Sequence, residues 1–310
     1  APGIAWKDQN AIQKHVISCV SLKCISLNDI RKKKFKIVID AVNGAGSNAL
    51  PALLESLGCD VVELNCEPSG IFNRGTEPLP ENLEDLSNAV IQHDADAGFA
   101  VDPDADRLAV VDENGKPLGE EYTLVLAADG YMKNVKKEDE TFVVNLSKSM
   151  ALEKLSIKNN IKVERSAVGE INVVNKMNEL SSNFGGEGNG GVILRESHLG
   201  RDSLVAATMV LNRMSQSEDP LSQLHASLPQ FQIIKDKISL EGIDPKVLIH
   251  KVESLFKEAS KSTIDGIKFT WEDKWVHLRK SNTEPIMRIY AEASDQESAL
   301  SLIKSIKELI

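Results

Sequence analysis

Short apolar runs alternate along the chain with longer stretches in which hydrophobic residues recur at helical spacing. Runs with the length of buried strands occur at residues 35–40, 97–101, 108–111 and 141–146. Amphipathic stretches separate them, and we expect helices at residues 48–57, 83–93, 120–132, 148–157, 169–177 and 203–213. Strands that alternate with helices in this way predict βαβ units with parallel sheets.

The first of these units consists of a strand, a glycine-containing turn, a helix and a second strand. Residues 35–40 are expected to form a strand, residues 43–47 a turn that ends in the N-cap residue Ser47, and residues 59–64 the next strand. The turn contains Gly44 and Gly46. Its amide groups could bind an anion at the helix N-terminus, but a tight structural turn explains the glycines equally well.

The pattern changes after a proline-bracketed linker helix between Pro220 and Pro229. A strand, a helix at residues 245–260, three closely spaced strands and a final helix predict an α+β domain. We therefore expect an α/β protein in which two βαβ-type three-layer domains precede a C-terminal α+β domain with an antiparallel sheet and two helices. The expected boundaries are residues 1–28 for an N-terminal linker segment, then 29–134, 135–228 and 229–310.

The N-terminal segment is expected to contain one helix, at about residues 8–24. Its apolar residues Val16 and Cys19 share a face, but the sequence offers no obvious surface for that face to pack on. The basic run at residues 31–34 is expected to be a solvated face in front of the first strand.

Composition and charge exclude several classes of partner. The 310 residues are 42% hydrophobic, which suffices for a large core. The net charge of −10 argues against general binding to nucleic acid or to a membrane surface, because both require a basic face. An anionic ligand must therefore meet local positive charge.

The four cysteines are Cys19, Cys24, Cys59 and Cys66, and they show neither zinc-type spacing nor the density of a secreted disulfide scaffold. We interpret them as reduced thiols. The sequence also lacks an apolar run of the roughly 20 residues that span a membrane, and its N-terminus has no signal-peptide pattern. These features predict a cytoplasmic protein.

The densest chemical signal is Asp102, Asp104 and Asp106, three carboxylates within five residues, followed by Arg107. Their repulsion is relieved by a hard divalent cation such as Mg²⁺ or Ca²⁺. The planar guanidinium group of Arg107 can donate two hydrogen bonds to a phosphate. A solvated acidic turn is the plain alternative. An EF-hand loop is the other, but Arg107 stands where that loop needs glycine, and the flanking residues resemble strands.

A glycine-rich segment at residues 186–191 matches G-x-G-x-x-G literally. A dinucleotide site requires this pattern between a strand and a helix, whereas here it leads into the apolar run at residues 192–194. We expect instead a backbone brought close to a small polar ligand, with Glu187 and Asn189 available to its hydroxyl groups. A flexible hairpin remains the structural alternative.

The third candidate lies between the last two expected strands, at residues 279–285, with Arg288 three residues beyond. Guanidinium groups, hydroxyls, an amide and turn backbone amides suit a dianionic phosphate. A charged hairpin turn is the structural alternative. The candidate phosphate ligands are Arg279, Ser281, Asn282, Thr283 and Arg288.

Taken together, these motifs resemble those of the α-D-phosphohexomutase superfamily, in the same order. The corresponding segments are residues 102–107, 186–191, 200–202 and 279–288, and further landmarks lie at residues 40–46 and 68–72. The resemblance runs from about residue 35 to the C-terminus and is equally close to bacterial phosphomannomutase, phosphoglucomutase and phosphoglucosamine mutase. It corresponds to the second, third and fourth of the family's four domains.

The resemblance implies an intramolecular phosphotransferase, an isomerase that interconverts hexose 1-phosphate and hexose 6-phosphate through a phosphoserine and a bisphosphate intermediate. The hexose is mannose, glucose or glucosamine. One Mg²⁺ ion would be held by the three aspartates, Glu187 and Asn189 would bind sugar hydroxyls, and the C-terminal loop would bind the phosphate that does not react. Arg107 would assist the reacting phosphate, and we make no assignment for His198.

The sequence departs from the family in two ways. The family's phosphoserine domain, with its Ser-His-Asn-Pro motif, has no counterpart, so residues 1–28 resemble the tail of that domain, and we expect this chain alone to be inactive. Asn189 also replaces a serine found in many members. A non-catalytic module that binds Mg²⁺ and sugar phosphate, as a truncated paralogue, is the alternative. The missing domain is then a potential partner.

Overall fold

The computed structural model describes residues 8–135, 140–281 and 284–310. The first domain contains a four-stranded sheet in the order β2-β1-β3-β4, in which only the β3–β4 pair is antiparallel. Helices cover both faces of this sheet. Its elements are β1 (Lys36–Asp40), α3 (Gly46–Ser56), β2 (Asp60–Leu64), a 3₁₀ helix (Pro80–Asn82), α4 (Glu84–Gln92), β3 (Ala97–Val101) and β4 (Leu108–Asp112).

The second domain repeats this plan, with strand order β6-β5-β7-β8 and one antiparallel pair, β7–β8. Buried apolar strands with short turns produce the same sheet twice, as the repeated sequence pattern predicts. Its elements are α5 (Tyr122–Asn134), β5 (Thr141–Asn145), α6 (Met150–Lys158), β6 (Lys162–Ser166), α7 (Glu170–Glu179), β7 (Phe184–Glu187), β8 (Gly191–Leu194) and α8 (Ser203–Ser215).

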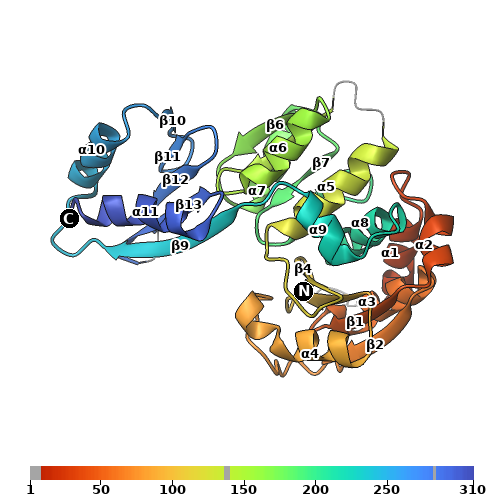
Figure 1. Ribbon diagram of the computed structural model, residues 1–310. Coiled ribbons are helices and arrows are strands. Elements are labelled where there is room, and N and C mark those ends of the chain that lie inside the picture. Colours follow the sequence, from red (N-terminus) through yellow and green to blue (C-terminus); the bar gives the residue numbers. More distant parts are fainter. Residues whose placement is uncertain (1–7, 136–139, 282–283) are drawn as a thin grey trace, which may run out of the picture.

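The C-terminal domain is an antiparallel sheet in the order β10-β11-β12-β13-β9 with two helices. It follows the short helix α9 (Leu221–Ser227) and stands beside the α/β domains (Figure 1). The predicted α/β class, with two βαβ-type domains before an α+β domain, is confirmed. The elements are β9 (Gln232–Ser239), α10 (Pro245–Leu255), β10 (Ser260–Ser262), β11 (Ile267–Thr270), β12 (Trp275–Lys280), β13 (Ile286–Ala293) and α11 (Gln296–Lys307).

The N-terminal segment differs from the prediction. It forms two helices, α1 (Ala11–Val20) and α2 (Leu27–Lys33), and the basic run closes α2, where Lys34 adopts a left-handed conformation with φ of 50°. The expectation that the first helix lacks a packing surface is wrong, because α1 packs on α3 and α8 and buries Val16 and Cys19. The sequence did not show this surface because it is formed jointly by α3 and by α8, a helix far along the chain.

Helix α8 is the centre of the two α/β domains. All of its residues are buried, and it packs against α5, α2 and α1. One apolar cluster consequently runs through both domains, whereas the C-terminal domain has a core of its own. The loops that precede α8 and β4 are therefore held on a shared, rigid support.

A buried carboxylate joins the C-terminal domain to the second α/β domain. Glu292 on β13 accepts hydrogen bonds from the Trp275 indole N–H (2.5 Å), from the Met150 backbone N–H (2.8 Å) and from the Ser149 hydroxyl. Burial raises the pKa of Glu292 to about 7, with a further contribution from the negative charge of Glu121, although the hydrogen bonds from Ser149 and Met150 oppose the change.

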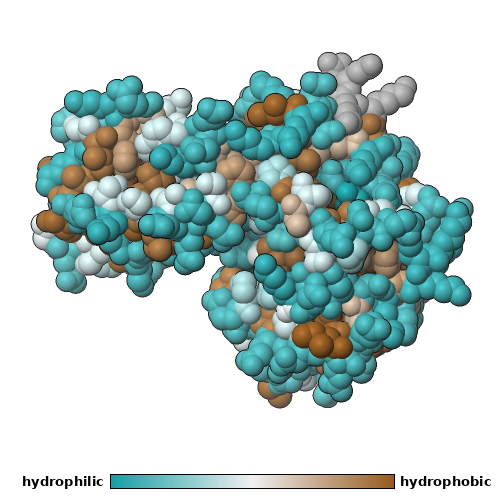
Figure 2. Space-filling model, viewed as in Figure 1, coloured by the Kyte–Doolittle hydropathy of each residue, from teal (hydrophilic) through white to brown (hydrophobic). Residues whose placement is uncertain are grey.

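The outer surface is mostly polar over the face shown in Figure 2, with apolar residues in scattered spots. Within the described parts of the chain, the search for a helix with the length and apolar character of a membrane span finds none.

The Glu292 contact makes stability depend on pH. Because the folded state keeps this proton up to about pH 7 while the unfolded state loses it near its ordinary pKa of 4.5, the stabilising contribution is full below pH 4.5 and is lost as the pH rises through about 7. Relative to Glu292→Gln, the wild type should lose on the order of 2 kcal/mol of unfolding free energy between about pH 5 and about pH 7.5. Urea unfolding at both pH values measures this difference.

An exposed control, Glu272→Gln, should run parallel to the wild type across the same pH range. Parallel profiles for Glu292→Gln and wild type would contradict the proposed protonation of Glu292.

Candidate functional site

A cleft of about 790 Å³ lies where the three domains meet. It brings together five of the residues singled out from the sequence, and these come from three separate loops. They are Arg107, Glu187, Asn189, Arg279 and Arg288. The three aspartates do not line the cleft themselves but lie in the same loop as Arg107.

The aspartate loop connects the antiparallel strands β3 and β4. Asp102 is buried, and its Oδ1 accepts the backbone N–H groups of Asp106 and Arg107, both at 3.1 Å. Its Oδ2 accepts the Arg107 Nε–H at 2.6 Å. Burial would raise the pKa of Asp102, but the hydrogen bonds and charge of Arg107 outweigh it and hold the pKa below its usual value. Asp102 therefore stays ionised.

The donor set fits a divalent cation. Oxygen atoms of Asp102, Asp104 and Asp106 lie within 4.8 Å of one another, and Asp104 is exposed. The Oδ1 atom of Asp106 is buried without a hydrogen-bond partner among the described residues. Burial, reinforced by the charge of Asp102, raises the pKa of Asp106 to about 6 against the opposing charge of Arg201. A bound cation would relieve both the orphaned oxygen and the repulsion.

The geometry also decides between the sequence alternatives for two turns. An EF-hand loop joins helices, whereas this loop joins two strands. The glycine-rich turn before α3 acts as a support for the loop: the Ala45 N–H donates to the Pro103 carbonyl oxygen at 2.8 Å. A Cβ at Gly44 would lie 2.5 Å from that same oxygen, so the close approach requires glycine.

The second glycine-rich segment is the hairpin between β7 and β8, which excludes the dinucleotide-binding geometry. Gly190, with φ of 87°, passes against the first domain, where its carbonyl oxygen accepts the Leu108 N–H at 3.1 Å. A Cβ there would meet the Leu108 carbonyl oxygen at 2.4 Å. The hairpin therefore reaches β4, which begins directly after the aspartate loop.

Glu187 is fixed at the base of this hairpin. Its Oε1 accepts the Asn145 side-chain N–H at 2.8 Å and the Gly169 N–H at 3.0 Å, and its Oε2 accepts an Arg201 N–H at 3.0 Å. A carboxylate has about four acceptor positions, so Glu187 retains one toward the cleft. Asn145 also lines the cleft, and its buried Oδ1 has no protein partner among the described residues.

Arg201 is a residue whose role the sequence did not reveal. Besides Glu187 it contacts Asp106 through Nη2, so one guanidinium joins the aspartate loop to the glycine-rich hairpin. Its place in the segment 200–202 was part of the family pattern. The signal that could have identified it is an arginine directly before the start of a helix. Its planar guanidinium group can donate to two carboxylates at once, here Asp106 and Glu187.

The third loop connects β12 and β13. Arg279 and Arg288 occupy directly opposed positions on these strands. Like charges in this arrangement repel, so the pair needs counter-charge. Asp265 supplies part of it by accepting the Arg279 Nε–H at 3.0 Å, and its other oxygen accepts the Val168 N–H at 3.1 Å. Among the described residues no carboxylate pairs with Arg288, which is exposed in the cleft.

The remaining predicted ligands in this loop differ in their positions. Ser281 is buried, its N–H donates to the Ile286 carbonyl oxygen at 3.0 Å, and its hydroxyl accepts the Glu284 N–H at 3.3 Å. It therefore stabilises the hairpin itself. Asn282 and Thr283 lie outside the described residues.

His277 is another cleft residue that sequence reasoning missed. Its Nε2 lies 2.6 Å from the Asp265 carbonyl oxygen and its Nδ1 lies 3.0 Å from the Ser147 hydroxyl. Burial lowers the pKa of His277 to about 4, so the ring is neutral near pH 7. A neutral ring with Nε2 protonated satisfies both contacts, which orients Ser147 at the cleft.

Comparison with known proteins agrees with this architecture. Three family models match successive parts of the chain: phosphoglucomutase/phosphomannomutase α/β/α domain II at residues 13–115, α/β/α domain III at residues 119–231, and the C-terminal domain at residues 240–309. The chain therefore belongs to the phosphoglucomutase/phosphomannomutase family, within the α-D-phosphohexomutase superfamily.

Two curated relatives illustrate the similarity. A phosphoglucomutase/phosphomannomutase of Thermococcus kodakarensis is 37% identical over 89% of this chain and 60% of its own length. A protein of Methanopyrus kandleri named "probable phosphoglucosamine mutase" is 32% identical over 98% of this chain and 66% of its own length. The chain thus spans less than two thirds of these relatives.

A crystal structure of a family protein from Burkholderia thailandensis matches the fold with a TM-score of 0.81 and 24% identity, covering 96% of this chain and 63% of that one.

Removing the exposed carboxylate of the aspartate loop tests the cation site. Asp104 has no hydrogen-bond or ion-pair partner among the described residues, so Asp104→Asn should leave the fold intact and weaken Mg²⁺ binding about tenfold or more, because one anionic ligand is lost. Calorimetric titration with Mg²⁺ measures the change.

Asp273→Asn, an exposed substitution in the turn before β12, is the matched control and should bind Mg²⁺ like the wild type. Equal affinity in all three proteins would mean that the loop is only a solvated acidic turn.

Proposed function

We propose that this chain provides the metal, sugar and phosphate sites of a phosphohexomutase, which exchanges the phosphoryl group of a hexose between its 1- and 6-positions. The observation that carries the proposal is that one cleft joins Arg107, the Glu187 hairpin and the Arg279–Arg288 pair, contributed by three domains. A ligand with a sugar ring and a phosphate at a distance from the reacting centre has the chemistry to engage all three loops.

The reacting phosphate belongs at the aspartate loop. Asp102, Asp104 and Asp106 would hold one Mg²⁺ ion, which neutralises charge on a phosphoryl group in transfer. Arg107 is anchored through Nε to Asp102 and faces the cleft, and its Nη1 lies 3.4 Å from Glu77. This anchoring leaves the outer part of the guanidinium at the cleft, where it can donate to phosphate oxygens.

The sugar belongs at the hairpin. Glu187 keeps an acceptor position toward the cleft after its three internal hydrogen bonds, and Asn189 offers an amide with both donor and acceptor character. Arg201 fixes Glu187 and also contacts Asp106, so the binding groups for the sugar hydroxyls and for the reacting phosphate keep a constant position relative to each other.

The second phosphate belongs at the C-terminal hairpin. Arg279 and Arg288 occupy opposed positions, and the one carboxylate beside them, Asp265, pairs with Arg279, so a phosphate dianion would complete the neutralisation. Asn282 and Thr283 remain candidate ligands there, and Ser281 holds the turn. Two ends that both recognise phosphate suit a ligand that is bound in either orientation, as an exchange between two positions requires.

We infer further that the phosphoserine which donates to the sugar is not among these 310 residues, since they contain no Ser-His-Asn-Pro motif. This chain then binds its ligand but is inactive alone. A non-catalytic sugar-phosphate-binding module remains the second candidate, favoured by the same missing motif.

Ligand binding and activity together test the function. The chain with Mg²⁺ should bind hexose phosphates and should convert none of them, even with a hexose bisphosphate present. Joining to it the part of the Thermococcus kodakarensis relative that lies outside the match should restore conversion of a hexose 1-phosphate to the 6-phosphate. Phosphate-independent binding of sugars, or no binding at millimolar concentration, would refute the proposal. Binding with an inactive, folded chimaera would favour the non-catalytic module.

The arginine pair makes a prediction of its own. A guanidinium contact to phosphate is charge-assisted, so Arg279→Ala should weaken hexose phosphate binding roughly ten- to a hundredfold. Arg279→Lys should recover only part of this loss, because an ammonium group keeps the positive charge but lacks the paired N–H donors of a guanidinium group. Titration of glucose 6-phosphate, or of inorganic phosphate, into the three proteins measures the effect.

Mg²⁺ affinity serves as the internal control and should be the same in all three proteins, because the aspartate loop belongs to another domain. Equal phosphate affinities would show that the phosphate is held elsewhere.

A further inference from the structure

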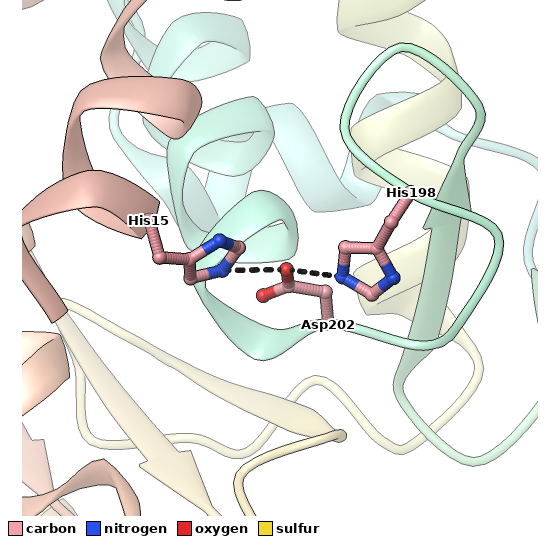
Figure 3. Close-up of side chains that lie close together, drawn as sticks. All are labelled: His15, His198 and Asp202. Atoms are coloured by element: carbon pink, nitrogen blue, oxygen red, sulfur yellow. Dashed lines mark hydrogen bonds and ion pairs between the residues drawn. The ribbon is translucent and has the colours of Figure 1, made fainter. Parts of the chain in front are cut away.

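Three potential metal ligands from distant parts of the chain, His15, His198 and Asp202, converge beside the start of α8, outside the cleft, and Cys19 lies next to His15. His15 and Cys19 lie one turn apart on α1, and His198 and Asp202 lie in the loop from β8 to α8. Figure 3 shows both imidazole rings pointing at the Asp202 carboxylate from opposite sides. The N-terminal helix and the second α/β domain therefore meet through these side chains.

Three of the ligand atoms, those of His15, His198 and Asp202, lie within 4.8 Å of one another, as a metal site requires. The Nε2 atoms of His15 and His198 lie 2.8 Å and 2.9 Å from the same oxygen, Oδ2 of Asp202. The Sγ atom of Cys19 lies 3.8 Å from Nε2 of His15. Ligand atoms of a tetrahedral zinc ion are about 3.3–3.7 Å apart, given bonds of about 2.0–2.3 Å. To admit an ion, the two rings must move away from Asp202 by roughly 0.5–1 Å, and Cys19, which lies outside the group of three, must approach the other ligands.

Asp202 is oriented for this role. Its Oδ1 accepts the N–H groups of Leu204 and Val205 at 2.8 Å and 3.1 Å, which caps α8 and turns Oδ2 toward the rings. The carboxylate is buried, and among the described residues its ion-pair partners are imidazoles, with no lysine or arginine.

We propose that His15, Cys19, His198 and Asp202 bind one Zn²⁺ ion at this site. Two imidazoles, a thiolate and a carboxylate are all zinc ligands, and Mg²⁺ prefers oxygen ligands alone. The chain then has two metal sites of different selectivity, a hard oxygen site at the aspartate loop and a softer nitrogen–sulfur site here. Four protein ligands make the second site closed, so it is structural.

The position of the site explains what a bound ion does. It ties α1 to the loop that carries Arg201, the residue next to Asp202 in the chain. Since Arg201 contacts both Asp106 and Glu187, the ion stabilises the connection between the aspartate loop and the glycine-rich hairpin. The plain alternative is that the two histidines only hydrogen-bond to Asp202, in which case Cys19 takes no part.

Cobalt substitution separates these two alternatives, since Co²⁺ in a tetrahedral site with a thiolate ligand gives visible bands and a sulfur-to-metal charge-transfer band. The reduced chain is titrated with Co²⁺ in excess Mg²⁺, which fills the aspartate loop. One equivalent should produce both bands, and Zn²⁺ should displace it. Cys19→Ser should lose the charge-transfer band.

His198→Gln should weaken Zn²⁺ binding about a hundredfold, since one of four ligands is removed. The His198 side chain is 47% exposed, so this variant should fold, and circular dichroism verifies it. Zn²⁺ should raise the melting temperature of the wild type and not that of this variant.

Matched controls come from the same chain. Cys59→Ser and His250→Gln change residues of the same types elsewhere, and Asp104→Asn removes a ligand of the other site. All three should keep the wild-type cobalt spectrum. Absence of a cobalt–thiolate band in the wild type, or unchanged Zn²⁺ affinity in both Cys19→Ser and His198→Gln, would overturn the proposal.

Discussion

The contact on which the rest of the site depends is the Arg201 guanidinium between Asp106 and Glu187. The two carboxylates belong to different domains, and each is needed at the edge of the same cleft. Without a cation between them they would repel each other, and the buried one would be costly to ionise. Arg201 therefore holds together two loops that would otherwise repel each other, and the two loops form a single surface. Its position is in turn fixed by the Asp202 cap of α8.

The same principle of shared counter-charge recurs at the C-terminal domain. Asp265 lies next to Arg279 and also accepts a backbone N–H from the second α/β domain, so it links the phosphate hairpin to that domain. Glu292 does the same at the far end of β12 and β13, where it binds Ser149, Met150 and Trp275. Each domain boundary near the cleft thus contains a carboxylate with partners on both sides.

Much of this could be predicted from the sequence, because the signals are local. The aspartate loop between strands, the glycine-rich hairpin and the two α/β units all follow from periodicity and turn residues within short windows. The roles of Arg201 and His277 could not be predicted, because the partners of Arg201 include a residue 95 positions away and those of His277 one 130 positions away. The packing of α1 was also missed, because its surface is formed jointly by α3 and the distant helix α8, and a linear pattern does not show that these two helices lie together.

The central claim is that the aspartate loop and the arginine pair bind opposite ends of one ligand. Phosphorus ENDOR of a frozen complex between the chain, a hexose 1,6-bisphosphate and Mn²⁺ in place of Mg²⁺ tests it directly, because it reports the distance from the metal to each phosphorus in either orientation of the ligand. The account predicts one strongly coupled and one weakly coupled phosphorus for each bound Mn²⁺ ion, and loss of this complex in Asp104→Asn at limiting Mn²⁺. Two equally coupled phosphorus nuclei, or no coupling to phosphorus, would contradict it.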